Sequence, residues 1–168
     1  MVSRELKRGS VKTLPQNVLI LGVGNLLLTD DGFGIHVIHT LKKRKFPPNI
    51  TLLEAGTVSH QMILTFREFE LLIVIDAIQA GDTPGSLFKF SPDDMQFPSK
   101  HLISLHELSL IDVLQMAELT GKRPETIIIA VQPKDVLSWS LELSDEVKAA
   151  VPKTIDLIIA ELKRSRAL

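Results

Sequence analysis

Residues 17–34, NVLILGVGNLLLTDDGFG, decide the fold class of this chain. Residues 17–21 form an apolar run that is typical of a strand buried on both faces of a parallel sheet. Gly22 and Gly24 end the run, because glycine allows backbone angles that are closed to other residues. An acidic turn and a helical pattern follow, so the glycine-rich loop lies at the carboxyl end of a strand. In open α/β sheets this is where ligands bind.

The loop does not fit a phosphate. The dinucleotide fingerprint G-x-G-x-x-G requires a third glycine where Leu27 stands, and the chain has no G-K-[ST] of a P-loop. Asp30 and Asp31 would also repel a pyrophosphate. A loop that ends in carboxylates is better suited to a cation or to proton transfer. One of the two aspartates can be structural and cap the next helix, but we do not expect this of both.

The composition is that of one domain of 168 residues with a full core. A net charge of −1, with one Trp and no Tyr, argues against nucleic acid or an anionic membrane as partner. The absence of cysteine excludes a thiol nucleophile and a cysteine-ligated zinc. No apolar run has transmembrane length, and no signal peptide is recognisable. We expect a cytoplasmic protein with residues 1–15 as a flexible basic leader and residues 16–168 as a single α/β domain.

Strands and helices alternate along the rest of the chain. Apolar runs predict strands at residues 50–53, 71–75 and 126–131, and a turn-linked strand at residues 86–90 that pairs antiparallel at a sheet edge. Helices are predicted after the acidic turn, at residues 59–66, from the capping box at residues 104–107, and after Ser144. Pro152 kinks the last helix or marks a second start. This order predicts a three-layer αβα sandwich around a mainly parallel, twisted sheet of about five strands.

Three side chains are the candidate site. Asp31 lies in the acidic turn, Asp76 directly follows the strand at residues 71–75, and His106 lies in the first turn of a helix. A buried carboxylate needs a partner, so Asp76 is expected to face the same crevice as Asp31. The helix dipole favours the neutral, metal-binding imidazole of His106. Two carboxylates and an imidazole suit Zn²⁺, Ni²⁺ or Fe²⁺ and leave positions for substrate or water. The residues alone thus indicate a metal-dependent hydrolase or a metal-sensing protein.

Several other residues are expected to be structural. His36 and His39 could share a metal, but the helical pattern predicts His36 on the solvated face and His39 near its boundary, so both are expected at the surface. Gly34 lies on the buried face of the same helix, which predicts close approach to a neighbouring backbone. Trp139 either lines a binding surface or packs under its loop, and we expect it to pack.

Three stretches of the chain resemble the hydrogenase maturation endopeptidases. They are GVGNLLLTDDGFG, the strand LLIVIDAI and the helix start SLHELSLIDVL, and the resemblance covers about residues 17–162. It implies an enzyme that removes a short carboxyl-terminal extension from the large-subunit precursor of a nickel–iron hydrogenase once nickel is inserted. It also implies that Asp31, Asp76 and His106 recognise nickel carried by the substrate, and that Asp30 is structural. Glu54 falls in the family's acidic turn after the second strand, which here reads EAGT.

We therefore predict a peptidase whose catalytic and nickel-recognising residues are Asp31, Asp76 and His106, with the large-subunit precursor as its partner. The free enzyme can bind nickel or another divalent metal at the same site, and it is expected to be a monomer. Two alternatives come from other classes. One is a non-catalytic nickel-binding factor in hydrogenase assembly. The other is a peptidyl-tRNA hydrolase-like enzyme, which the G-x-G-N turn suggests but which would require a basic groove for RNA.

Overall fold

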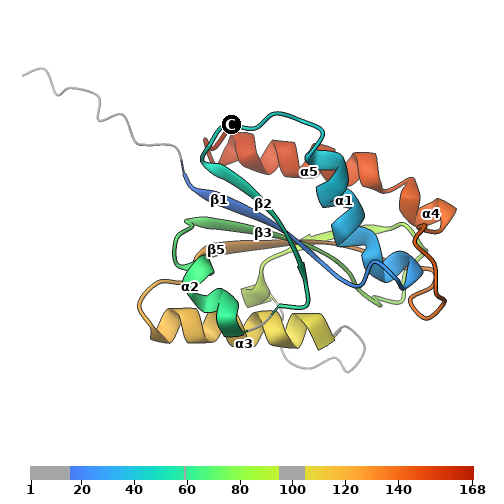
Figure 1. Ribbon diagram of the computed structural model, residues 1–168, viewed down its shortest axis with the longest axis horizontal. Coiled ribbons are helices and arrows are strands. Elements are labelled where there is room, and N and C mark those ends of the chain that lie inside the picture. The colour runs from blue at the N-terminus through green and yellow to red at the C-terminus, as the bar shows by residue number, and fades with distance from the viewer. Residues whose placement is uncertain (1–15, 59, 95–104) are drawn as a thin grey trace, which may run out of the picture.

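Five strands form one sheet in the order β2-β1-β3-β5-β4, shown by the computed structural model in Figure 1. The structure describes residues 16–58, 60–94 and 105–168. β1, β2, β3 and β5 are parallel, and β4 pairs antiparallel with β5. The predicted sheet with one antiparallel edge strand is therefore confirmed. The strands are β1 (Val18–Val23), β2 (Ile50–Gly56), β3 (Leu71–Ala77), β4 (Leu87–Phe90) and β5 (Glu125–Val131).

Helices cover both faces of the sheet, as Figure 1 shows. α1 (Phe33–Leu41) and α5 (Val151–Arg164) pack on one face, and α2 (Ile63–Phe66) and α3 (Leu105–Leu119) pack on the other. This arrangement is the predicted αβα sandwich. Short elements complete it, namely α4 (Asp145–Lys148) and the 3-10 helices η1 (Thr29–Gly32), η2 (His60–Met62) and η3 (Pro92–Asp94). None of the helices described has the length and apolarity that a membrane span requires.

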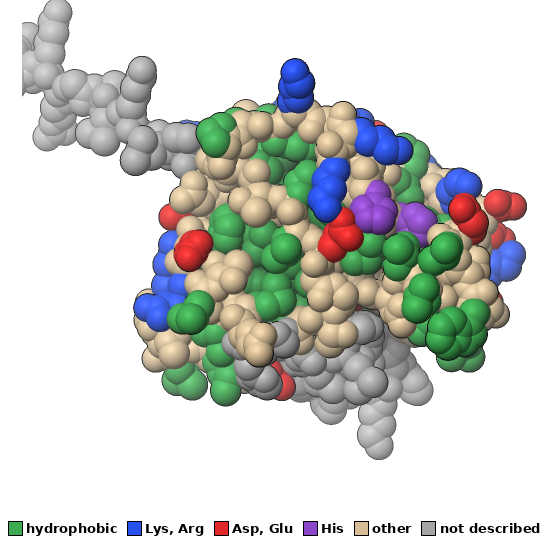
Figure 2. Space-filling view, in the orientation of Figure 1, with side chains coloured by type: hydrophobic (Ala, Val, Ile, Leu, Met, Phe, Trp, Pro, Cys, Tyr) green, Lys and Arg blue, Asp and Glu red, His purple; other side chains and the backbone are tan. Residues whose placement is uncertain are grey.

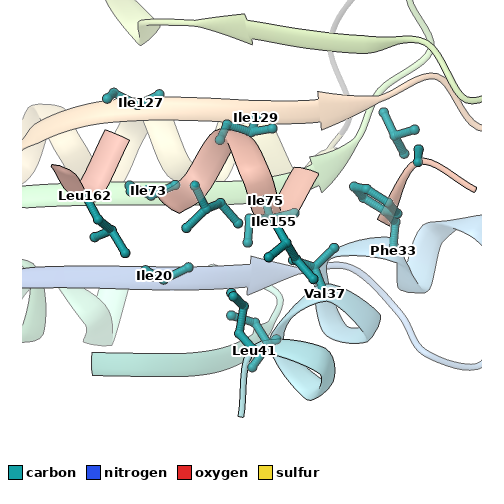
Figure 3. Packing of buried hydrophobic residues seen from close by; sticks show 14 of the residues in the cluster. Ile20, Phe33, Val37, Leu41, Ile73, Ile75, Ile127, Ile129, Ile155 and Leu162 are labelled. Carbon is teal, nitrogen blue, oxygen red and sulfur yellow. The ribbon is translucent and has the colours of Figure 1, made fainter. Parts of the chain in front are cut away.

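The core has two parts because successive strand residues face opposite sides of the sheet. Figure 3 shows the part between the sheet and the layer of α1 and α5, where Ile20, Ile73 and Ile129 pack together. Their strand neighbours Leu19, Leu72 and Ile128 fill the second part, against α2 and α3. β1 and β3 are buried along their whole length. The apolar runs that predicted buried parallel strands therefore occupy the centre of the sheet.

The structure differs from the predicted element ends at several points. β3 continues to Ala77, because the ladder to β5 includes the pairs of Asp76 with Ala130 and of Ala77 with Val131. Asp76 thus lies inside the strand rather than after it. β2 likewise continues to Gly56 and includes Glu54. Pro152 lies in the first turn of α5, so it marks a second helix start and not a kink.

α1 lies directly on the backbone of the sheet. A Cβ atom on Gly34 would stand 2.4 Å from the carbonyl oxygens of both Val23 and Ile75, and a Cβ atom on Gly22 would stand 2.4 Å from the Gly34 carbonyl oxygen. No other residue fits at these two positions without moving the helix. The predicted close approach at Gly34 is confirmed. It keeps η1, which leads into α1, in contact with β3.

Replacement of Gly34 tests this contact. We expect Gly34→Ala to lower the free energy of unfolding by about 3 kcal/mol, since the added methyl group meets two carbonyl oxygens. Without that clash, alanine in a helix would raise stability by about 0.5–1 kcal/mol. Urea denaturation measures the difference. Gly56→Ala is the matched control, because its Cβ meets nothing within 4 Å and only its φ of +57° is unfavourable. An equal or smaller loss at Gly34 than at Gly56 would contradict the close approach.

Candidate functional site

Asp31 is held at the carboxyl end of β1 by the glycine-rich loop. Its Oδ2 accepts a hydrogen bond of 2.8 Å from the Asn25 backbone N–H, and Asn25 Oδ1 accepts one of 3.0 Å from Leu27 N–H. Gly24 has a φ of +126°, and a Cβ there would lie 1.8 Å from the Asp31 carbonyl oxygen. Only glycine allows the loop to turn back so closely. The loop therefore places the half-buried Asp31 carboxylate beside the end of β1.

Asp30, its neighbour, points into the protein and is fully buried. Its Oδ2 accepts hydrogen bonds from the backbone N–H groups of Lys134 and Asp135, at 2.8 and 3.0 Å. Ser144 donates from its backbone N–H to Oδ1 at 2.8 Å and from its hydroxyl to Oδ2 at 2.9 Å. These four bonds compensate the burial of the carboxylate. The structural role expected for Asp30 is confirmed, although it anchors the β5–α4 loop rather than capping a helix.

Asp76 lies on the face of the sheet that packs against α3. Side chains alternate between the two faces along a strand, so Asp76 points to the same face as Leu72 and Val74, which belong to that part of the core. Only 2% of Asp76 is exposed. Its Oδ1 accepts a hydrogen bond of 2.7 Å from the Ala77 N–H. Since η1 contacts β3, Asp31 and Asp76 lie at the same edge of the sheet.

His106 is the second residue of α3. α3 leads by a short connection into the amino end of β5, so its own first turn lies at the carboxyl edge of the sheet, as Figure 1 shows. The backbone of His106 is therefore at the predicted edge, and its side chain lies outside the described part of the structure. Among the side chains that are described, no three His, Asp or Glu residues form a group that could hold a metal ion. The set of Asp31, Asp76 and His106 stays a prediction.

Glu54 pairs with α1. Its Oε1 lies 3.2 Å from His39 Nε2 and accepts a hydrogen bond from the Lys42 ammonium group. The hydrogen bond from Lys42, with a smaller contribution from His39, holds the pKa of Glu54 below its ordinary value. Glu54 is thus an ionised side chain that joins β2 to α1.

The expected positions of the two histidines are half correct. The side chain of His39 is 46% exposed, as predicted. His36 is half-buried, and its Nε2 is buried with no hydrogen-bond partner among the described residues. It lines a cavity of about 240 Å³ with Leu143, Lys148 and four further residues. The expectation of a solvated His36 is wrong, because the end of the β5–α4 loop folds over this face of α1.

Trp139 and Ser144 also differ from expectation. Trp139 is 80% exposed, so the prediction that it packs under its loop is wrong. Ser144 occupies the N-cap position of α4 as expected, but makes no side-chain cap, since its hydroxyl donates to Asp30. The periodicity of apolar residues predicts neither the exposure of Trp139 nor the hydrogen-bond partner of the Ser144 hydroxyl. The result for Ser144 depends on the contact of one buried carboxylate with a loop more than one hundred residues later in the chain.

The fold and the edge of the sheet define the class of protein: a three-layer α/β protein with two aspartates at the carboxyl edge, Asp31 in the 3-10 helix that follows β1 and Asp76 at the end of β3. Carboxylates in that position support binding of a cation or activation of water. The family model described as "Hydrogenase maturation protease" (HycI) matches residues 35–161. The chain belongs to this family, and is therefore a peptidase of hydrogenase maturation.

Individual relatives agree with the family match. The hydrogenase expression/formation protein HupM of Azotobacter chroococcum is 34% identical over 149 residues, which cover 87% of this chain and 71% of HupM. A putative hydrogenase maturation protease of Methanocaldococcus jannaschii is 33% identical over 153 residues, covering 89% and 98%. The structure of the hydrogenase maturating endopeptidase HybD from E. coli has a TM-score of 0.79 at 29% identity, covering 89% of this chain and 93% of HybD.

Removal of the buried carboxylate tests its anchoring role. We expect Asp30→Ala to lower the free energy of unfolding by about 3 kcal/mol, because four donors lose their acceptor. The amides of Lys134, Asp135 and Ser144 should also exchange their hydrogens faster. Urea denaturation and hydrogen exchange measure the two effects. Asp156→Ala, an exposed position on α5, is the control and should change stability by less than about 0.5 kcal/mol. Unchanged exchange in Asp30→Ala would contradict the anchor.

The environment of His36 predicts a pH dependence of stability. Burial lowers the pKa of His36 from its ordinary value of 6.5, although the Leu141 backbone and Glu142 act in the opposite direction. In the window between the folded and the unfolded pKa, the unfolded chain binds more protons, so stability is complete above about pH 6.5 and falls below it. Urea denaturation at pH 7.5 and 5 should show a smaller loss in His36→Leu than in the unmodified protein. Equal losses in both would overturn the assignment to His36.

Proposed function

We propose that this chain removes the carboxyl-terminal extension from the nickel-loaded large-subunit precursor of a nickel–iron hydrogenase. In this proposal, Asp31, Asp76 and His106 contact the nickel that the precursor carries. The observation that supports it best is the contact of η1 with β3, which brings two aspartates from distant parts of the sequence to one edge of the sheet. Their oxygens, with an imidazole nitrogen, match the ligands that a divalent transition metal accepts.

Both aspartates are oriented by the backbone. The Asn25 N–H binds Oδ2 of Asp31 and the Ala77 N–H binds Oδ1 of Asp76. Hydrogen bonds of this kind fix the direction of a carboxylate before the metal arrives and so reduce the cost of ordering it. Asp76 is further restrained by burial, whereas Asp31 is half-buried and closer to solvent. The nickel of the precursor would complete this partly formed site.

In this proposal, the peptide is cleaved because the bound nickel places it next to the aspartates. Binding of the nickel would hold the adjoining peptide beside the aspartates, where one carboxylate can orient and deprotonate the attacking water. A precursor without nickel lacks the ion that joins it to these side chains, so its peptide is not held there. The substrate's own metal content would thus decide whether it is cut. Nickel is part of the substrate in this scheme and not a resident cofactor.

We also propose that residues 16–168 act as one domain and that the chain works as a monomer in the cytoplasm. The single sheet with one continuous core on each face supports the first statement. A chain without cysteine is compatible with a reducing compartment.

Substitution of the three site residues tests the proposal. Asp31→Asn, Asp76→Asn and His106→Gln should each slow processing of the nickel-loaded precursor at least about 100-fold, because the peptide is no longer positioned. The mass of the precursor before and after incubation measures this, and circular dichroism checks that each variant folds. Asp156→Asn is the control and should process normally, and the unmodified protein should leave nickel-free precursor uncut.

Full processing by any two of the three variants would refute the assignment of the site. A stable complex between the unmodified protein and nickel-loaded precursor, with no change in the precursor's mass, would instead support the non-catalytic assembly factor.

A further inference from the structure

Four large apolar side chains are exposed beside the glycine-rich loop. Leu27, Leu137, Trp139 and Leu141 are 49%, 83%, 80% and 58% exposed, and together they are called the apolar patch. They come from two neighbouring segments, because Ser140 N–H donates to the Leu27 carbonyl and Thr29 N–H to the Ser140 carbonyl, both at 3.1 Å. In Figure 2, apolar side chains gather on the right, over the β5–α4 loop and close to the histidines of α1.

The patch is held in place by polar contacts. Thr29 donates from its hydroxyl to the Ser138 carbonyl at 2.7 Å. Asp135 Oδ1 accepts from the N–H groups of Leu137 and Ser138, at 2.9 and 3.0 Å. The buried Asp30 carboxylate accepts hydrogen bonds from residues near the start of the same loop, Lys134 and Asp135. A loop with this many fixed backbone groups presents its apolar side chains in a defined arrangement, and exposed apolar clusters of this kind commonly mark interaction surfaces.

The patch is continuous with the candidate site. Leu27 lies in the loop that Asn25 closes onto Asp31, and Asp30, which anchors the patch, is the residue before Asp31. The apolar patch and Asp31 therefore belong to the same hydrogen-bonded loop region, so a protein that binds at Asp31 is close to the patch.

The charges around the patch indicate the chemistry of its partner. Lys134 pairs with Glu146 at 2.8 Å, and Lys148 pairs with Glu142 at 3.5 Å. Since these exposed charges are neutralised within the chain, they do not call for a strongly charged partner surface. An apolar centre that contains a tryptophan, surrounded by polar groups, is the common anatomy of a protein–protein interface.

We propose that the apolar patch is the docking surface for the hydrogenase large-subunit precursor, which contacts it with an apolar part of its own folded surface. This inference rests on the proposed function, because that function supplies the protein substrate. The patch binds the body of the precursor, and the aspartates act on its carboxyl-terminal region.

The double variant Leu137→Ser/Trp139→Ser tests the proposal in steady-state processing of nickel-loaded precursor. We expect KM to rise by about 30-fold, as is typical when a tryptophan anchor is lost, with kcat unchanged. Leu64→Ser/Leu119→Ser is the matched control. These leucines are 70% and 87% exposed on α2 and at the end of α3 far from His106, and KM should stay within about 2-fold. An unchanged KM in the patch variant overturns the proposal.

A second measurement separates this inference from the proposed function. The Asp76→Asn variant should bind nickel-loaded precursor through the patch but not cut it, whereas the patch variant should cut it once it is bound. Normal cutting by Asp76→Asn and by one of the other two site variants would refute the site and leave the patch result valid. Inactive Asp76→Asn together with an unchanged KM in the patch variant would refute the docking surface alone.

The single tryptophan of the chain provides a direct probe. With 5-fluorotryptophan incorporated, the ¹⁹F resonance of Trp139 should shift or broaden when unlabelled precursor is added. It should not change when the concentration of this chain alone is raised. A change on self-concentration, with a dimer in sedimentation that the patch variant does not form, would assign the patch to a second copy and overturn the proposal.

Discussion

The contact between α1 and the backbone of the sheet is the constraint on which the site depends. At Gly34 the helix lies so close to β1 and β3 that a methyl group has no space. A larger residue would push the helix outward, and η1, which is continuous with the helix, would move with it. η1 carries Asp31 and contacts β3, which carries Asp76. The distance between the two aspartates is therefore set by a backbone contact that involves neither of them.

A second constraint is the opposite direction of two adjacent carboxylates. A 3-10 helix has about three residues per turn, so neighbouring side chains point about 120° apart. Asp30 consequently points into the protein and holds the β5–α4 loop, while Asp31 stays at the crevice. Both roles need an acidic residue, but for different reasons. Asp30 must accept four hydrogen bonds in a buried place, and Asp31 must present oxygen at a partly solvated one.

The sequence was sufficient for the fold and for part of the site. Buried parallel strands produce long apolar runs, so the sheet and the position of Asp76 near a strand end were predictable. The exact strand ends were not, because the ladder between β3 and β5 extends past the apolar run at Ile75. His36 and Trp139 were placed wrongly because their exposure depends on how the β5–α4 loop lies against α1 and η1. Such contacts between distant segments leave no periodic pattern in the sequence.

The two proposals assign two tasks to two surfaces: the apolar patch binds the precursor, and the candidate site distinguishes nickel-loaded from nickel-free precursor. The apolar patch would meet the body of the precursor in the same way before and after nickel insertion, so its contribution to affinity is equal for both forms. An interaction that is equal for two substrates cannot distinguish them, however strong it is. Discrimination then rests on the contacts that only a loaded precursor makes, at Asp31, Asp76 and His106. A strong patch would therefore collect unloaded precursor as well, and its affinity has to remain low enough for that precursor to leave uncut.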